Sequence, residues 1–259
     1  MKINLNADLG ESFGAYSIGN DEELLGVVGA ANIACGFHGG DPVVISRAIA
    51  RARETGASIG AHPGHADLQG FGRRPMQLAP EELRMSVIYQ VSAVAGMARA
   101  LGHPITHVKP HGAMNNQACV DRAMADTIAR AVAETDPDLI LLAPALSELA
   151  AAGEAAGLTV ALEIFADRTY EPDGSLTPRS RPGSVLHGTQ EALAHVKRMI
   201  EAGGLVTREG EVLPTPFHSI CVHGDGPEAL GTASALREAL ADWGHAPVDL
   251  PTAVRGTAA

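Results

Sequence analysis

The chain has 259 residues, with 30 aspartates and glutamates against 19 lysines and arginines, which gives a formal net charge of −11 at pH 7. This acidity, with an aromatic content of only 3%, argues against a protein that binds nucleic acids or anionic membranes. The sequence has no signal-peptide pattern and no uninterrupted apolar stretch of about 18 residues, and its three cysteines are widely spaced. We therefore expect a cytoplasmic protein with free thiols and with no nucleic-acid or membrane partner.

Short apolar runs alternate with longer helical patterns along the whole chain. Strands are expected at residues 2–8, 31–35, 57–61, 106–109, 139–143, 159–165 and 219–222. Helices are expected at residues 22–28, 42–54, 80–101, 122–134, 145–156, 190–202 and 228–243, and a short hairpin at 204–213. Seven such units without a linker predict one α/β domain over residues 1–250, followed by a flexible tail at 251–259.

Several of the expected strands have one polar and one apolar face. In the first strand Asn4, Asn6 and Asp8 alternate with apolar residues, and in the fourth His107 and Lys109 do the same. A doubly wound sheet is apolar on both faces, because helices cover both of them. A polar face on strands flanked by helices instead suits a closed barrel with a polar lumen. The sequence therefore predicts a seven-stranded (β/α) barrel of the α/β class with a polar lumen.

Ionisable residues follow six of the seven expected strands, at the sheet edge where parallel α/β folds bind their ligands. In chain order they are Asp8, Glu11, His38, Asp41, His62, Asp67, Arg73, Arg74, Lys109, His111, Asp167, Arg168, His223 and Asp225. Because these strand ends share one rim, we expect His38, His62, His111 and His223 to lie close together. Asp41 stands directly before a proline and is equally suited to cap the next helix.

Other reactive residue types receive structural roles. Cys35 and Cys221 are expected to be small buried residues rather than nucleophiles. The remaining histidines considered are expected to be structural (His218) or solvated (His103, His195 and His245).

Two kinds of ligand remain open for the rim. Histidines with an aspartate suit zinc or another divalent ion, with Asp8, His38 and His62 as candidate ligands. The chain lacks a compact motif such as H-E-x-x-H, so a tightly bound transition metal is not predicted. Phosphate groups would instead be neutralised by the cations of the site loops, which are Arg73, Arg74, Lys109, Arg168, Arg179 and Arg181. There is no P-loop motif and no G-x-G-x-x-G after a strand, so any nucleotide site is of another kind.

Eight sequence motifs follow one another along the chain. They cover residues 4–11, 31–38, 60–63, 70–74, 108–113, 165–168, 178–180 and 222–225. Together they resemble the LamB/YcsF family, the 5-oxoprolinase A subunits, from Lys2 to about Trp243. The resemblance implies a barrel of the glycoside hydrolase/deacetylase type and ATP-dependent opening of 5-oxo-L-proline (pyroglutamate) to L-glutamate. It also implies ATP with Mg²⁺ and separate B and C subunits as partners, while a homo-oligomer is left open.

This resemblance assigns roles to the strand-end residues. The expected catalytic set is Asp8, Glu11, His38, His62, Lys109, His111, Asp167 and His223. The expected substrate- or phosphate-binding set is Asn6, Asp41, Arg73, Arg74, Arg168, Arg179 and Asp225. The acids would serve as base or magnesium ligand, the cations would steady phosphates, and the histidines would orient substrate or transfer protons. Departures from the family pattern at Gly39, Gly64-His65 and Met114-Asn115-Asn116 concern the expected shape of the substrate pocket.

Two other functions are compatible with the same residues. One is a metal-dependent deacetylase or carbohydrate hydrolase with the same barrel, in which a histidine and aspartate site activates water. The low aromatic content disfavours this function, because sugar-binding platforms usually need rings. The other is a non-catalytic binding subunit that completes the site of its partners.

Overall fold

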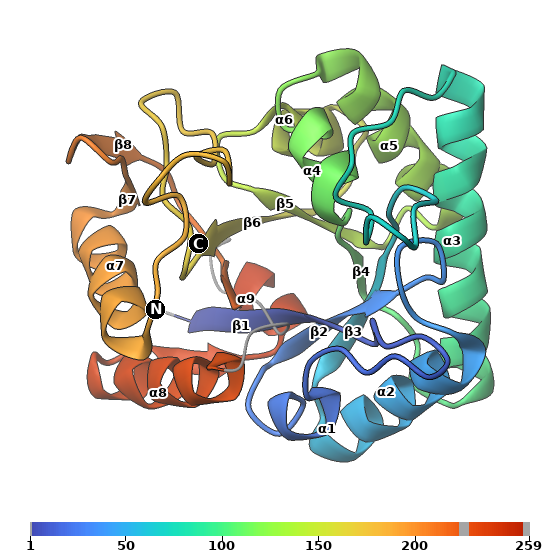
Figure 1. Ribbon diagram of the computed structural model, residues 1–259, viewed down its shortest axis with the longest axis horizontal. Helices are drawn as coiled ribbons and strands as arrows, with labels where there is room; N and C mark the ends of the chain where they lie inside the picture. The colour runs from blue at the N-terminus through green and yellow to red at the C-terminus, as the bar shows by residue number, and fades with distance from the viewer. Residues whose placement is uncertain (1, 223–227, 256–259) are drawn as a thin grey trace.

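The expected alternation of strands and helices is confirmed in a computed structural model, which describes residues 2–222 and 228–255. Seven parallel strands lie in the predicted positions to within one or two residues. They are β1 (Lys2–Leu9), β2 (Ala30–Ala34), β3 (Ser58–His62), β4 (His107–Val108), β5 (Ile140–Pro144), β6 (Val160–Phe165) and β9 (Ser219–Val222). Each pairs with the next, and β9 pairs with β1, so that the sheet closes into the predicted barrel (Figure 1).

Helices surround the barrel and cover the apolar outer face of its strands (Figure 1). They are α1 (Asp21–Leu24), α2 (Pro42–Thr55), α3 (Pro80–Ala100), α4 (Gly112–Ala118), α5 (Arg122–Thr135), α6 (Glu148–Ala155), α7 (Thr189–Ala202), α8 (Ala229–Asp242) and α9 (Leu250–Arg255). Among the described residues, none of these helices combines the length and the hydropathy needed to cross a bilayer.

Three elements differ from the expectation. Helix α6 begins only at Glu148, because Leu146 has a φ of +61° and Ser147 caps the helix by accepting a hydrogen bond from the Ala150 amide. The short helix α4 and strand β10 (Ala246–Val248), which pairs with the start of β1, were not expected. The expected hairpin is confirmed as β7 (Gly204–Val206) and β8 (Val212–Pro214).

The lumen of the barrel is polar, as predicted. Asn4, Asn6 and Asn32 have fully buried side chains and form a chain of hydrogen bonds with Ser219. Their neighbour His107 is also buried, and its Nε2 lies 2.9 Å from Asn32 Oδ1. Each of these side chains therefore has a hydrogen-bond partner, which offsets the cost of removing it from water.

The N-terminal end of the barrel is closed by apolar residues. Leu250 of α9 packs with Ala30, Ile140, Leu142 and Ala161, which lie near the start of their strands. Residues 250–255 therefore form a docked helix where a flexible tail had been expected from residue 251. Its amphipathic pattern is too short to be distinguished from a tail by sequence.

The absence of a side chain at Gly60 gives the His107 ring its place in the lumen. A Cβ atom at Gly60 would lie 2.3 Å from the His107 ring. We expect Gly60→Ala to lower the free energy of unfolding by about 3 kcal/mol, at the upper end of the range for overpacking. Urea denaturation measures this change. Gly96→Ala, on a part of α3 where an added Cβ contacts nothing within 4 Å, should instead be neutral or stabilising. A neutral Gly60→Ala would contradict the packing described for His107.

Candidate active site

Polar side chains converge where β1, β2, β3, β4 and β6 end, at the open mouth of the barrel. They form two adjoining groups. The first, here called the lysine network, consists of Asn6, Asp8, Lys109 and Glu163. The second, here called the histidine cluster, consists of Glu11, His38, His62 and His111. The predicted catalytic set contributes Asp8, Lys109 and the whole histidine cluster, the predicted binding set contributes Asn6, and Glu163 was in neither set.

Lys109 is the centre of the lysine network. Its side chain is buried, and its Nζ lies 3.1 Å from Asn6 Oδ1, from Asp8 Oδ1 and from Glu163 Oε2. Cys221 Sγ lies at the same distance from Nζ. Burial alone would lower the pKa of Lys109, but the carboxylates of Asp8 and Glu163 raise it well above its usual value. Lys109 is therefore a fixed positive charge.

The two carboxylates that contact Lys109 have different surroundings. Glu163 is fully buried, which raises the pKa of its carboxyl group despite the opposing effect of Lys109. Its second oxygen, Oε1, has no hydrogen-bond partner among residues 2–222 and 228–255. The side chain of Asp8 keeps 14% exposure. Asp8 Oδ1 accepts a hydrogen bond from Asn32 Nδ2 at 2.9 Å, and Oδ2 lies 3.4 Å from His62 Nε2. Asp8 thus links the lysine network to the histidine cluster and faces the mouth.

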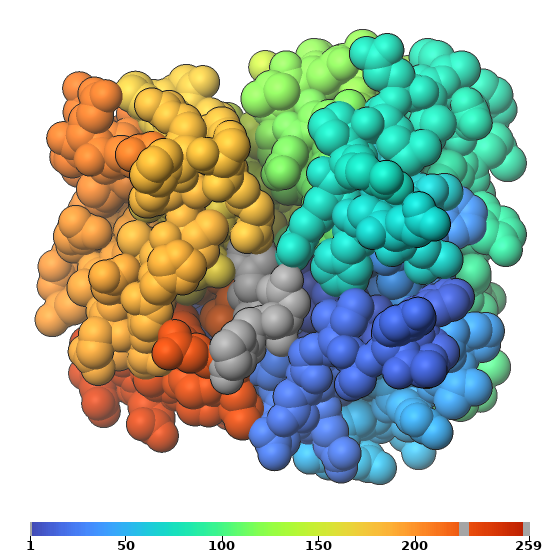
Figure 2. All heavy atoms as spheres, in the orientation of Figure 1, coloured from blue at the N-terminus to red at the C-terminus, as the bar shows by residue number. Residues whose placement is uncertain are grey.

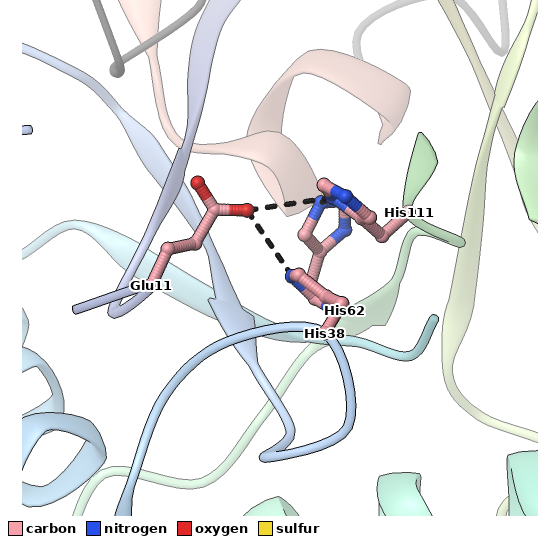
Figure 3. A group of neighbouring side chains, drawn as sticks. All are labelled: Glu11, His38, His62 and His111. Atoms are coloured by element: carbon pink, nitrogen blue, oxygen red, sulfur yellow. Dashed lines mark hydrogen bonds and ion pairs between the residues drawn. The ribbon is translucent and has the colours of Figure 1, made fainter. Parts of the chain in front are cut away.

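The histidine cluster draws its members from four different strand ends. Glu11 follows β1, His38 lies in the loop after β2, His62 ends β3, and His111 precedes α4. Their side chains are buried, and His38 stacks on His111 with ring centroids 3.7 Å apart (Figure 3). Burial lowers the pKa of His38 and of His111 well below the usual value, so both rings are neutral near pH 7.

Gly72 allows the two stacked rings to pack closely. It has a φ of +61°, and a Cβ atom there would lie 2.7 Å from His38 Cβ and 2.9 Å from His111 Cδ2. The preceding residue, Phe71, places its carbonyl oxygen 2.8 Å from His111 Nε2. The segment 70–72, which the family motif contains, therefore supports the histidines through its backbone. A glycine is required here both by the left-handed conformation and by the space.

Asp41, predicted as a cap or as a binding residue, is a helix cap. Its Oδ1 accepts hydrogen bonds from the Val43 and Val44 amides at the start of α2, and its Oδ2 accepts one from the Gly14 amide. These backbone donors account for both oxygens. The structure therefore does not bring the Asp41 carboxylate into the lysine network or the histidine cluster.

The predicted cations are distributed around the mouth rather than gathered at one point. Arg168 is buried, and it donates hydrogen bonds to the carbonyl oxygens of Ser184 and Thr177, so it holds the 169–186 loop in place. Burial, together with the nearby Arg179, lowers the pKa of Arg168 to about 10. Arg74 forms an ion pair with Asp67, and exposed Arg181 pairs with Glu171. Figure 2 shows the loops around residues 65–80 (teal) and 168–187 (gold) on opposite sides of the molecule's centre.

The other predicted site residues have varied positions. Arg73 is exposed and lies over the Phe71 ring, beside the histidine cluster. Asp167 is half-buried after β6, and Arg179 is exposed. His223 and Asp225 lie outside the described residues.

Some structural expectations need correction, and others are confirmed. His195 is buried rather than solvated, with Nε2 2.9 Å from the Arg168 carbonyl oxygen. His218 is structural as expected, because its Nδ1 accepts a hydrogen bond from the Leu162 amide. Cys35 and Cys221 are buried, and burial raises the pKa of both thiols.

Sequence reasoning did not assign Glu163, Asn32 and His107 to the site. Glu163 lies within β6 rather than after it, so the rule of strand ends passed over it. Its position on the polar face of the strand was a signal that could have identified it. Asn32 and His107 carry the same signal, because each alternates with buried apolar residues of its strand.

The departures at the rim are also positioned. His65 is buried, and its Nε2 lies 2.8 Å from Gln117 Oε1 on α4. Asn115, on the same helix, is buried as well. A Cβ atom at Gly39 would lie 2.8 Å from the Glu11 carbonyl oxygen, so the glycine allows the loop after β2 to approach Glu11 closely.

A cleft of about 650 Å³ lies away from these groups, between the 12–22 segment and α2. Tyr16, Arg47 and Arg51 are among its lining residues, and within the described part of the chain no predicted site residue lines it. Its position on the outer side of α2 separates it from the chemistry at the barrel mouth.

Comparisons with known proteins agree with this architecture. The chain is 58% identical over 251 residues to a 5-oxoprolinase A subunit from Azoarcus sp. (strain BH72), covering 97% of this chain and 98% of that protein. The crystal structure of a lactam utilization protein from Thermus thermophilus superposes with a TM-score of 0.90 at 43% identity, covering 96% of this chain and 100% of that one. The catalytic domain of a peptidoglycan N-acetylglucosamine deacetylase from Eubacterium rectale shares the fold, with a TM-score of 0.52 at 10% identity and coverage of 97% and 89%.

The family assignment follows from the extent of these matches. The model of the LamB/YcsF family matches residues 3–254, which include nearly every residue of the barrel strands and both groups at the mouth. This chain belongs to the LamB/YcsF family.

Proposed function

We propose that the chain is the A subunit of an ATP-dependent 5-oxoprolinase, which opens the lactam ring of 5-oxo-L-proline to give L-glutamate. The observation that carries this proposal is the buried Lys109 held between Asp8 and Glu163 at the mouth of the barrel. It supplies a positive charge between two carboxylates of different exposure, in a chain closely similar to the 5-oxoprolinase A subunit from Azoarcus. Ring opening needs such a combination of charge stabilisation and proton transfer.

The proposed reaction proceeds in balanced steps. The lactam oxygen takes the γ-phosphoryl group of ATP and the ring nitrogen loses its proton, which gives an imidate phosphate and ADP. Water adds to the imidate carbon, and the carbon–nitrogen bond then breaks as protons return to nitrogen. The resulting γ-glutamyl phosphate reacts with a second water to give glutamate and phosphate.

The lysine network offers a role for each charged group in ring opening. Lys109 stabilises negative charge that develops on oxygen, because its own charge is fixed and shielded from water. Asp8, the carboxylate nearer the mouth, accepts a proton from the attacking water. Glu163, whose pKa burial raises, is suited to return a proton to the leaving nitrogen. Asn6, which donates to Glu163 and accepts from Lys109, holds both in position.

Partners and cofactors form part of the proposal. The relatives are named as one lettered subunit of 5-oxoprolinase, which supports membership of a complex, and we propose separate B and C subunits as its other members. ATP would bind with Mg²⁺, and exposed Arg73 at the mouth is suited to contact its phosphates. Asp167 and Arg179, which also lie at the mouth, are further candidates for contact with this ligand.

Glutamate formation tests the proposal directly. The purified chain is incubated with 5-oxoproline, ATP and Mg²⁺, with and without the candidate B and C subunits. We expect glutamate to form in the complete mixture and to disappear when this chain or ATP is omitted. A complete mixture that makes no glutamate, or that makes it equally well without this chain, contradicts the proposal.

Variants separate the alternative functions. His62→Ala, Lys109→Ala and Asp167→Ala should abolish 5-oxoproline-dependent ATP turnover and leave the fold intact, as circular dichroism can show. Full turnover in two of these three variants would point to a non-catalytic subunit. Release of acetate from an N-acetylated sugar without ATP would instead identify a deacetylase.

A further inference from the structure

The histidine cluster has the composition of a metal site. One ligand atom from each of Glu11, His38, His62 and His111 lies within 4.8 Å of all the others, and all four side chains are buried. Figure 3 shows the three rings gathered beside the Glu11 carboxylate. The sequence had suggested Asp8, His38 and His62 as candidate ligands, and the structure brings Glu11 and His111 to this point as well.

Two backbone carbonyl groups fix the protons on the outer sides of two rings. His62 Nδ1 lies 2.6 Å from the Lys109 carbonyl oxygen, and His111 Nε2 lies 2.8 Å from that of Phe71. A carbonyl oxygen only accepts hydrogen bonds, so both of these ring nitrogens carry a hydrogen. In the neutral rings, His62 Nε2 and His111 Nδ1 therefore carry lone pairs, and these are the atoms that point into the cluster.

The inner atoms of the cluster are acceptors that face one another. His62 Nε2 and His111 Nδ1 are 3.0 Å apart, and His111 Nδ1 is 3.4 Å from Glu11 Oε1. His38 Nε2 lies 3.1 Å from the same oxygen. Its Nδ1 has no hydrogen-bond partner in the part of the chain that the structure describes, so no acceptor fixes the proton of this ring. Such a concentration of lone pairs and negative charge calls for a cation at its centre.

A metal ion satisfies this arrangement better than a proton does. A proton on one imidazole would join two of the inner atoms, whereas a metal ion accepts electron pairs from all four. Histidine ligands of metals usually donate their other N–H to a backbone carbonyl or a carboxylate, as His62 and His111 are placed to do. The cluster is therefore already oriented in the manner of a metal centre.

We propose that Glu11, His38, His62 and His111 bind one divalent transition-metal ion, for which zinc is the best match. Three imidazole nitrogens and one carboxylate oxygen suit zinc and related ions, whereas Mg²⁺ takes oxygen ligands almost exclusively. This site is distinct from any magnesium bound with ATP. When bound, the ion supplies a Lewis acid beside Asp8, whose Oδ2 lies 3.4 Å from His62 Nε2. The proposal does not depend on the proposed lactam-opening activity, because its test measures binding.

Metal titration of protein without an affinity tag tests the site. The chain is stripped with a chelator, and binding of Zn²⁺ and of Co²⁺ is followed by calorimetry and by the visible absorption of Co²⁺. We expect one equivalent of each ion to bind, to raise the melting temperature, and to resist a large excess of Mg²⁺. Binding of less than half an equivalent of both ions to folded protein overturns the proposal.

Ligand variants locate the ion. Glu11→Gln and His111→Gln should each weaken Zn²⁺ binding by more than the ~10–100-fold typical of losing an outer-shell partner. His103→Gln is the control, because His103 also contacts a backbone carbonyl, that of Ala57, but lies outside the cluster. Circular dichroism confirms that each variant folds, and the metal-induced rise in melting temperature provides a second measurement. Unchanged affinity in both ligand variants places the ion elsewhere and overturns the assignment.

Discussion

Replacing Lys109 with methionine is expected to abolish glutamate formation and to lower the free energy of unfolding by about 3–5 kcal/mol. Methionine has a similar length, so the change removes the charge with little change of volume. Asp8 and Glu163 would then face each other across the lumen without the ammonium group that lies 3.1 Å from each of them. Urea denaturation measures the loss of stability, and the assay with candidate B and C subunits measures the loss of activity.

A second variant identifies the cause of the instability. Adding Glu163→Gln to Lys109→Met removes the more deeply buried charge, so it should restore part of the lost stability, with a coupling of about 0.5–3 kcal/mol. Activity should stay absent in the double variant, because the positive charge is still missing. Arg122→Gln, which removes an exposed ion pair with Asp126, is the control and should change stability by less than about 1 kcal/mol. Purely additive effects of the two lumen substitutions would contradict a charge interaction between Lys109 and Glu163.

Asp8→Asn is expected to slow glutamate formation by about 10²–10⁴-fold while the protein remains folded. Asparagine has nearly the same shape, and Glu163 remains beside Lys109 to balance its charge. What is lost is a carboxylate able to accept a proton at the mouth of the barrel. Steady-state kinetics with the complete subunit mixture measure the effect as a fall in kcat.

The matched control for this substitution is Asp121→Asn. Asp121 caps α5 by accepting a hydrogen bond from the Met124 amide, and asparagine is an equally good capping residue. This variant should keep full activity and stability. If Asp8→Asn retained more than about a tenth of the wild-type rate, Asp8 would not be the base, and the role would pass to another acid at the mouth.

The barrel could be predicted from local sequence patterns because its strands are short apolar runs with one polar face. The alternation in β1 indicated a polar lumen, and the observed hydrogen bonds of Asn6 and Asn32 agree with it. Helix α4 was missed because it begins at a glycine with a φ of +51° and contains two consecutive asparagines, which are poor helix formers. Its helical form depends on packing in the folded protein, and sequence propensity does not report such packing.

The site was predictable in position and less so in detail. Strand ends identified Asp8, Lys109 and the histidines, because topology alone brings these points together. The role of Arg168 was not predictable, because its partners are carbonyl oxygens of a loop that returns to it from residues 177 and 184. Such contacts depend on the path of the backbone, and an arginine that binds a loop has the same sequence signature as one that binds phosphate.

The docked helix α9 gives the barrel the form of a cup rather than of a tube. Its Leu250 seals the floor together with Ile140 and Leu142, so within the described residues the polar lumen has an apolar floor on that side. Reactants and products must then share one entrance, and an unstable intermediate made at the mouth has no second exit. A partner subunit that hands over such an intermediate would have to do so at the rim that carries Arg73 and the 169–186 loop.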